Sequence, residues 1–598
     1  MKTASNYLDY FGWNPQLLRE IKGKLKQRNI IATIAASVIA QFAIVIYHLS
    51  ELPDYKAGEL PRDGLTESIT EYSRYCIETL PTEPLKGHLY HLDPALCSAD
   101  LKSSWIINWN VFWWDIFLIL SVIGIGLLLV LGTYFLISNF LTENKQDTLG
   151  LVRLSPQSAS SIFLGKILGV PILLYLGIAT AFPMHLVSAL QAGINLGLLI
   201  GFYVAVVASC AFFYSLGLLV SLLFPFAIVS WIFAGAIALF LSYLSLLTTY
   251  IHEASTSSIF DWLLFFNPNN LLLALGETTG IHYRYFDFEG LSHFRSGFDP
   301  NNDMFFFDSV LFYGKAIGTK TGMAIGAVIA NFSLWTYWLW QALTRRYYNP
   351  QSTAITKTQS YWITAWFMVL SLGFSLQDIS RYNDGWFGED RFLLNMSLLK
   401  LVLATYFVAL MFLLTPHRQT LSNWARYRHQ VKGKTWQQLV FNEESPAVVA
   451  IMLNMAIAII YALPSLFMFT LRKDANIVAL SIVLIVGTIV FYSTLVQLLF
   501  LNKSKHPVVI AGLVLATLSI GIPMCVGIIT PSGSLIDLVL LFTPFSLAVS
   551  SIGDMTQAVW VIMGQWLAIA VVSLQIRKNL RIAGRSESYA ALTGKPQT

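Results

Sequence analysis

Few ionisable residues in this sequence stand where a side chain could do chemistry. His185 lies inside a long apolar run and Lys400 lies at the edge of another, positions where a charge is costly and often functional. We expect His185 to hydrogen-bond a neighbouring helix and Lys400 to extend its amine toward water. A role for His185 in substrate binding or proton transfer is the alternative.

The other polar clusters do not have the pattern of an active site. His252, Glu253 and the acids and histidines between residues 287 and 308 lack the spacing of metal ligands. The phosphate-binding pattern G-x-x-x-x-G-K-[ST] of an ATPase is also absent from the sequence. We therefore predict no catalytic centre, metal or cofactor in this chain, and we do not expect it to be an enzyme.

The composition predicts a membrane protein. Of the 598 residues, 55% are hydrophobic and 12% are charged, whereas about 25% are charged in an ordinary soluble domain. The net charge of +5 is too small to indicate binding to nucleic acid. We predict an all-α, polytopic membrane protein with about twelve transmembrane helices in two parallel six-helix repeats.

The apolar runs give the boundaries of these helices. In the first half the predicted spans are residues 29–49, 112–138, 163–189, 194–223, 226–250 and 316–343, and in the second half 360–376, 397–415, 447–470, 476–501, 507–529 and 556–575. A segment with linker composition, residues 348–360, separates a first membrane domain, residues 1–347, from a second, residues 361–598.

Basic residues set the predicted orientation, because they gather on the cytoplasmic side of membrane proteins. Both termini are predicted to be cytoplasmic, and only Arg472 and Lys473, in a short outer turn, depart from this rule. The basic flanks on the cytoplasmic side are Lys22 to Arg28, Arg153, Lys166, Arg345 and Arg346, then Arg418 to Lys434, Lys503, Lys505 and Arg577 to Arg585.

A repeated segment precedes the last span of each half. Residues 261–279 and 537–556 align with Pro268 opposite Pro544 and Glu277 opposite Asp554. Each segment is too short and too broken by proline to span, so we predict two re-entrant helices that enter from the outside. Chance similarity between two apolar stretches is the alternative.

Two cysteines lie in the first outer loop. Cys76 and Cys97 would form a disulfide if this loop faces an oxidising compartment, and otherwise they are two free thiols.

Two segments predict helices at the cytoplasmic surface. Residues 14–28 place apolar side chains on one helical face with basic residues around it, which is typical of a helix in the headgroup region. Between the second and third spans, Thr148, Leu149 and Leu151 have helical spacing and are followed by Ser155 and Pro156. The second segment predicts a short helix that projects from the membrane.

With these motifs the chain resembles the permeases of type-2 ABC exporters. The resemblance rests on Glu143, the Thr148-Leu149 pair, the Ser155-Pro156 pair and the run from Ile162 to Lys166. Residues 14–28 are similar to the interfacial elbow helix of that family. By layout the resemblance extends over most of residues 14–346.

The resemblance implies a coupling helix at residues 142–156 that docks on a separate ATP-binding subunit. The contacts it implies are Glu143, Asp147, Thr148 and Leu151, followed by the break at Ser155 and Pro156. It also implies a bacterial inner membrane location, with membrane lipids and a second permease chain as further partners, although one chain with two halves would also suffice. The second cytoplasmic loop, residues 416–446, is basic and lacks this pattern, so it docks differently or rests on anionic headgroups.

Two other functions stay open from the residues alone. An ion- or proton-coupled carrier with the same layout would need buried charges in its spans, which are scarce. A membrane enzyme or assembly factor would need a convergent polar cluster in the outer loops. The substrate is not specified by the sequence: lipid, glycan, peptide and drug all fit.

Overall fold

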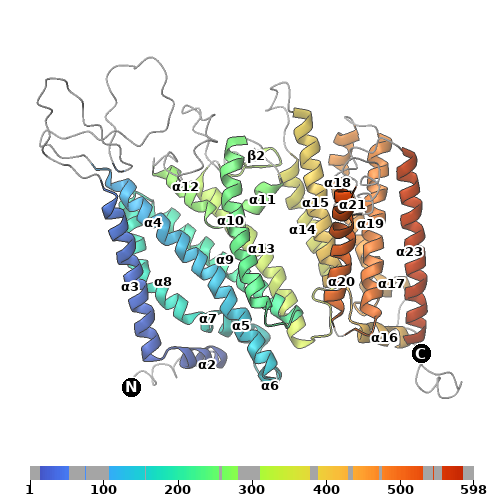
Figure 1. Ribbon diagram of the computed structural model, residues 1–598, viewed down its shortest axis with the longest axis horizontal. Coiled ribbons are helices and arrows are strands. Elements are labelled where there is room, and N and C mark those ends of the chain that lie inside the picture. The colour runs from blue at the N-terminus through green and yellow to red at the C-terminus, as the bar shows by residue number, and fades with distance from the viewer. Residues whose placement is uncertain are drawn as a thin grey trace, which may run out of the picture. The chain divides into compact units, whose positions relative to one another are not determined.

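The computed structural model describes residues 14–52, 75, 107–154, 156–254, 259–279, 310–318, 320–376, 388–427, 435–470, 475–504, 506–529, 543 and 555–583 (Figure 1). Among these residues, nine helices are long and apolar enough to cross a membrane, or ten if a bent pair counts as one span. The chain is an all-α, multi-pass membrane protein. The number twelve and the repeat layout stay predictions.

The chain divides into two compact units. Unit 1 comprises Met1–Thr256, Leu263–Val310 and Ala316–Leu339, and unit 2 comprises Ser257–Trp262, Leu311–Lys315 and Trp340–Thr598. Helix α13, Thr321–Tyr348, belongs to both.

Unit 1 is built from helices that pack along their lengths. In order they are α2 (Pro15–Lys24), α3 (Gln27–Ser50), α4 (Trp109–Gly126), η2 (Leu127–Leu131), α5 (Gly132–Lys145), α6 (Thr148–Arg153), α7 (Ala159–Gly169), α8 (Ile172–Gln191), α9 (Leu196–Leu223), α10 (Val229–Ala254) and α12 (Asn270–Thr278). Helix α8 packs on α3 and α4, and α5 packs on α9 and α10.

The predicted span 163–189 is wrong as a single helix, because the structure ends α7 at Gly169 and starts α8 at Ile172. The break is at Pro171. Its ring clashes with the carbonyl of the residue four positions earlier, and its nitrogen has no hydrogen to donate to that carbonyl. That carbonyl, on Ile167, instead accepts a hydrogen bond of 2.9 Å from the Tyr175 hydroxyl. A side chain thus satisfies the group that proline leaves free.

The second span is continuous but contains a π-helical turn. Helices α4 and α5 are joined through η2, so that Trp109–Lys145 forms one candidate span. The Leu128 carbonyl within η2 accepts a hydrogen bond of 2.8 Å from Tyr214 on α9. Here too an irregular backbone is stabilised by a neighbouring helix.

The segment predicted as the first re-entrant helix is broken at its proline. Helix α11, Phe260–Leu264, is followed by a turn containing Pro268 and then by α12, which carries Glu277 near its end. Buried Asn267 supports the turn, donating to the Leu241 carbonyl at 3.2 Å and the Ser245 hydroxyl at 2.8 Å. Pro544 and Asp554 of the second copy lie outside the described residues, and the depth of both segments stays a prediction.

A small hairpin interrupts the helices before α13. Strands β1 (Leu311–Phe312) and β2 (Lys315–Ala316) are joined by Tyr313 and Gly314, which have φ angles of 48° and 74°. Two successive positive φ angles are typical of the two-residue turns that connect antiparallel strands.

Unit 2 consists of α14 (Lys357–Ser375), α15 (Gly388–Leu414), α16 (Arg418–Tyr427), α17 (Thr435–Phe441), α18 (Val448–Thr470), α19 (Ala475–Leu501), α20 (Pro507–Ala516), η7 (Thr517–Gly521), α21 (Ile522–Ile529) and α23 (Met555–Ala583). Helix α14 begins with a capping box between Thr356 and Gln359. Its Thr364 hydroxyl then donates to Asn454 of α18 at 2.6 Å, inside the unit.

Candidate functional site

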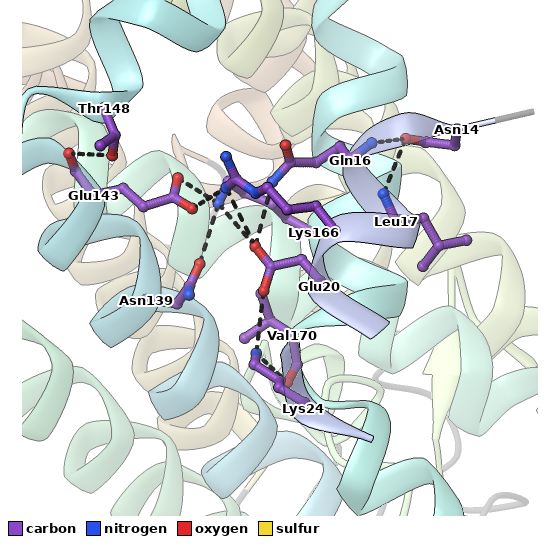
Figure 2. Close-up of polar contacts among 11 residues, drawn as sticks. Asn14, Gln16, Leu17, Glu20, Lys24, Asn139, Glu143, Thr148, Lys166 and Val170 are labelled. Carbon is purple, nitrogen blue, oxygen red and sulfur yellow. Dashed lines mark hydrogen bonds and ion pairs between the residues drawn. The ribbon is translucent and has the colours of Figure 1, made fainter. Parts of the chain in front are cut away.

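Helix α2 is fixed on α7 by the residue that starts it. The Asn14 side-chain oxygen accepts from the N–H groups of Gln16 and Leu17, at 3.1 Å and 3.2 Å, and so caps the helix (Figure 2). The Asn14 amide nitrogen donates to the Ser161 carbonyl of α7 at 2.6 Å. One side chain therefore sets both the start and the position of α2.

Two glycines on α7 allow α2 to come close. Gly165 and Gly169 are one turn apart, the spacing at which small residues let two helices approach. A Cβ at Gly165 would lie 2.9 Å from the Leu17 backbone nitrogen, and one at Gly169 would lie 2.6 Å from the Glu20 Cβ. Neither position has room for a larger residue.

Between these glycines, Lys166 holds the centre of a buried ionic cluster. Its side chain is fully buried, and its amine lies 2.6 Å from the Glu143 carboxylate of α5 and 3.7 Å from the Glu20 carboxylate of α2 (Figure 2). It also donates to the Asn139 side chain at 3.1 Å. Helices α2, α5 and α7 thus share one cation.

Two further cations surround these carboxylates on α2. Arg19 pairs with Glu143 and lies 3.5 Å from Glu20, while Lys24 lies 3.4 Å from Glu20. The Lys24 amine also donates to the Val170 carbonyl at 2.7 Å, at the end of α7. Burial lowers the pKa of Lys24, and the neighbouring Glu20 carboxylate opposes that shift. Three cations and two carboxylates therefore bind α2 to α5 and α7.

Next to this cluster, the chain turns from α5 into α6. Asp147 has a φ of 55°, the left-handed conformation that ends a helix, and the Thr148 hydroxyl donates to the Glu143 carbonyl at 3.1 Å. Helix α6 ends beside Leu154, whose side chain is 84% exposed. The turn places a short helix with an exposed leucine directly after the buried Glu143.

The conformation of Asp147 gives a testable prediction. We expect Asp147→Gly to leave α6 intact, because glycine adopts positive φ freely, and Asp147→Val to destabilise the turn by about 1–2 kcal/mol. Hydrogen exchange of the α6 amides measures both effects. Equal exchange rates in the two variants would show that the turn does not depend on this conformation.

The structure places the predicted coupling residues in two different environments. The helix predicted at 142–156 is shorter, since residues up to Lys145 continue the long second span and α6 covers only Thr148–Arg153. Glu143 is buried and paired within the chain, so its carboxylate is not presented to a partner.

The remaining predicted residues follow that buried glutamate. Asp147 and Pro156 are exposed and Thr148 is half-buried. Leu151 lies in α6, and its side chain and Ser155 lie outside the described residues. The surface available to a partner therefore starts at the turn, after Glu143.

From the sequence, Lys166 was used for the orientation and as the end of the Ile162 to Lys166 motif, and it was not brought together with Glu20 or Glu143. The available signal was a lysine within an apolar helix, between two glycines four residues apart. A second signal was the only acid, Glu20, in the basic segment 14–28.

Unit 2 also contains a buried lysine, Lys357, near the loops that are predicted to be cytoplasmic. The Lys357 amine donates to the Ser445 hydroxyl at 2.6 Å and to the carbonyls of Leu439 and Pro446 at 2.8 Å and 3.1 Å. These acceptors are neutral, whereas Lys166 lies beside two carboxylates. The lysine ties α14 to the segment that precedes α18.

The other candidate residues have structural surroundings. His185 lies between the Ser121 hydroxyl of α4, at 2.8 Å, and the Tyr203 hydroxyl of α9, at 2.9 Å. This confirms the prediction that His185 hydrogen-bonds neighbouring helices. Lys400 is half-buried in α15, and Cys76 and Cys97 lie outside the described residues. Within the described ranges, no group of three or more potential metal ligands occurs.

No protein-family model, no curated protein and no solved structure matches this chain.

Proposed function

We propose that this chain is the membrane-spanning permease of an ATP-driven exporter of the ABC type. In this proposal a separate ATP-binding subunit docks on α6 from the cytoplasm and supplies the energy of ATP hydrolysis. The observation that carries the proposal is the buried Lys166–Glu143 pair, which joins the end of α5, one turn before α6, to α7. Glu20 and Arg19 connect the same pair to helix α2, the proposed elbow.

The mechanism follows from the rigidity of this connection. A force applied to α6 passes through a two-residue turn into the 37-residue helix Trp109–Lys145. The buried cluster distributes the same force to α2 and α7, because separating its charges would leave them unpaired in a dry environment. The helices of unit 1 then move together, as in rigid-body transitions between packed elements.

The contact surface that we assign to the ATP-binding subunit is Asp147, Thr148 and Leu154. Leu154 supplies an apolar contact and Asp147 a charge, and both are exposed. Glu143, which the family resemblance implies as a contact, receives the role of a positioning residue instead. Membrane lipids and a second permease chain remain further proposed partners.

One observation favours a second candidate, a proton-coupled carrier. The Tyr75 hydroxyl donates to the Asp115 carboxylate at 3.0 Å and lies 2.9 Å from His48 Nδ1, and all three side chains are buried. A buried aspartate and histidine linked by a hydroxyl could carry protons. A carrier of this kind would use a proton gradient, whereas the exporter would use ATP. The two candidates therefore differ in their energy source.

Co-purification distinguishes the two candidates. We expect the tagged wild-type chain in mild detergent to retain an ATPase, and Asp147→Asn combined with Leu154→Asp to lose at least about 90% of it, since one such contact at an interface centre is worth about 2 kcal/mol. Asparagine tolerates the left-handed conformation, so Asp147→Asn removes the carboxylate at position 147 without straining α6.

A matched control comes from another exposed residue of unit 1. Ile228, which is 63% exposed between α9 and α10, lies on the same predicted side of the membrane. Ile228→Asp should retain the ATPase. If the wild type purifies alone and without ATP hydrolysis, the exporter proposal fails and the proton-coupled carrier becomes the better account.

A further inference from the structure

Four helices of unit 1 form a closely connected group. The ionic cluster of Lys166 joins α2, α5 and α7, the Asn14 amide joins α2 to α7, and α6 follows α5 after a two-residue turn. Gly165 and Gly169 bring α2 and α7 into direct contact. We call α2, α5, α6 and α7 the basal module. Because separating its buried charges is costly, the basal module should keep its internal geometry when it moves.

Three connections join the basal module to the other helices of unit 1, and the regular α-helix is interrupted in each. Between α2 and α3 the helix ends at Lys24 and resumes at Gln27, and Figure 1 shows α2 lying across the end of α3. The π-helical turn η2 separates α4 from α5. The break at Pro171 separates α7 from α8.

Two tyrosines connect the second interruption to the third. Tyr214 of α9 donates to the Leu128 carbonyl of η2 at 2.8 Å. Tyr175 of α8 donates to the Ile167 carbonyl of α7 at 2.9 Å. The two tyrosine hydroxyls also lie within hydrogen-bonding reach of each other. The turn in the second span and the break after α7 therefore share one pair of side chains.

Lys24 connects the first interruption to the third. Its carbonyl, the last of α2, accepts from the Asn29 side chain at 3.1 Å. Its amine donates to the Val170 carbonyl at 2.7 Å, after the end of α7. A backbone carbonyl without a partner is costly in the dry interior of a membrane protein. Because side chains can rotate with the carbonyls they bind, these interruptions can bend without losing their hydrogen bonds.

The start of α5 is also its close contact with α9. A Cβ at Gly132, the first residue of α5, would overlap the Tyr214 side chain. A Cβ at Gly217 of α9 would lie 2.7 Å from the Thr133 Cγ2. Helices α5 and α9 are thus in close contact directly after η2. A helix that pivots there moves little at this contact and most at its far end, which carries Glu143 and leads into α6.

We propose that the basal module moves as one body on a hinge formed by these three interruptions. Bending at residues 25–26, 127–131 and 170–171 would take up the movement, while α9 and α10 stay continuous. Hinges absorb such movements at a few residues between rigid elements. In the exporter, the helices that move together with α6 would be those of the basal module. The hinge itself does not rest on the exporter function, because it involves only contacts within unit 1.

Double electron–electron resonance on the full chain tests the hinge without any nucleotide. Spin labels attached to p-acetylphenylalanine leave the native cysteines in place. One label pair, at Lys22 and Lys145, lies inside the basal module, and the second pair joins Lys145 to Ile200 of α9; all three side chains are exposed. We expect the distance distribution of the second pair to be wider by roughly 2 Å or more, the size of helix shifts in known transitions.

Pro171→Ala should reduce this excess width. Alanine restores a backbone N–H, so α7 and α8 can join into one helix, and we expect the second pair to lose at least about half of its excess width. Pro183→Ala is the matched control, because Pro183 already lies inside the continuous helix α8. It should leave both distributions as in the wild type.

A second variant tests the hinge at η2. Gly126 directly precedes η2, and a Cβ there would meet no atom within 4 Å, so Gly126→Ala should stiffen the second span and narrow the same distribution. Circular dichroism checks that each variant keeps its helices. Equal widths of the two label pairs in the wild type would overturn the proposal, and so would equal narrowing by Pro171→Ala and Pro183→Ala. Failure of an ATPase to co-purify would count against the exporter alone.

Discussion

Lys166→Met is expected to destabilise unit 1 by about 3 kcal/mol, the largest effect of any single substitution in the ionic cluster. Removing the lysine leaves Glu143 and Glu20 in place, with side chains only 11% and 7% exposed. The cations that remain, Arg19 and Lys24, are 48% and 28% exposed, so the two carboxylates lose their one fully buried partner, and incomplete compensation of buried charges is strongly destabilising. Thermal unfolding of the purified chain in detergent, followed by helical circular dichroism, measures the loss.

The cluster itself supplies the comparison. Arg19 pairs with the same carboxylates, but its side chain is 48% exposed, so we expect Arg19→Gln to cost less than about 1 kcal/mol. Adding Glu143→Gln to Lys166→Met should recover part of the stability, because it removes a carboxylate that has lost its buried partner. An equal loss in Lys166→Met and Arg19→Gln would show that the buried lysine is not the centre of the cluster.

Gly169→Ala is expected to release the elbow helix α2 from α7. The new Cβ would lie 2.6 Å from the Glu20 Cβ, which is too close to the α2 backbone to move independently of it. We expect a loss of about 1–3 kcal/mol, as in other overpacked sites. Faster hydrogen exchange of the α2 amides, while α9 exchanges as before, would localise the effect to the elbow.

A glycine on α2 itself is the matched control for this substitution. A Cβ at Gly23 would meet no atom within 4 Å, so alanine there should stabilise the helix by about 0.5–1 kcal/mol. The same glycine-to-alanine substitution is thus expected to change stability in opposite directions at two positions of one helix pair. If Gly23→Ala and Gly169→Ala change the exchange of α2 alike, close packing through Gly169 is not what holds the elbow.

The class of the protein and most of its helices follow from the sequence, because a span is a local property of about 20 residues. The start of α2 is equally local: Asn14 and Pro15 are residues that begin helices. His185 was also predictable, because a polar side chain in an apolar run must find a partner on another helix.

Proline shows where local reasoning fails. Pro171 breaks the predicted span 163–189, whereas Pro183 and Pro464 lie inside continuous helices. At the Pro171 break, Tyr175 and Lys24 satisfy the carbonyls of Ile167 and Val170. The sequence contains the prolines, but not the tertiary partners that decide their effect.

The candidate site was only partly predictable for the same reason. Glu143 was found by its motif, but its partners Lys166 and Arg19 are 23 and 124 residues away in the chain. Glu143, which its motif predicts to be a surface contact, is therefore buried by residues that are distant in the sequence. Asp147 and Leu154, which depend only on the local turn, do lie on the surface.

Photo-crosslinking from position 154 tests the central claim most directly. The full chain would carry p-benzoylphenylalanine in place of Leu154, the 84% exposed residue beside α6, and a matched chain would carry it at Ile228. After irradiation of intact cells, we expect an adduct from position 154 with a polypeptide that binds ATP, and none from position 228. Adducts from position 154 with lipid alone, or with the same proteins as from position 228, would contradict the proposal that α6 couples this chain to an ATPase.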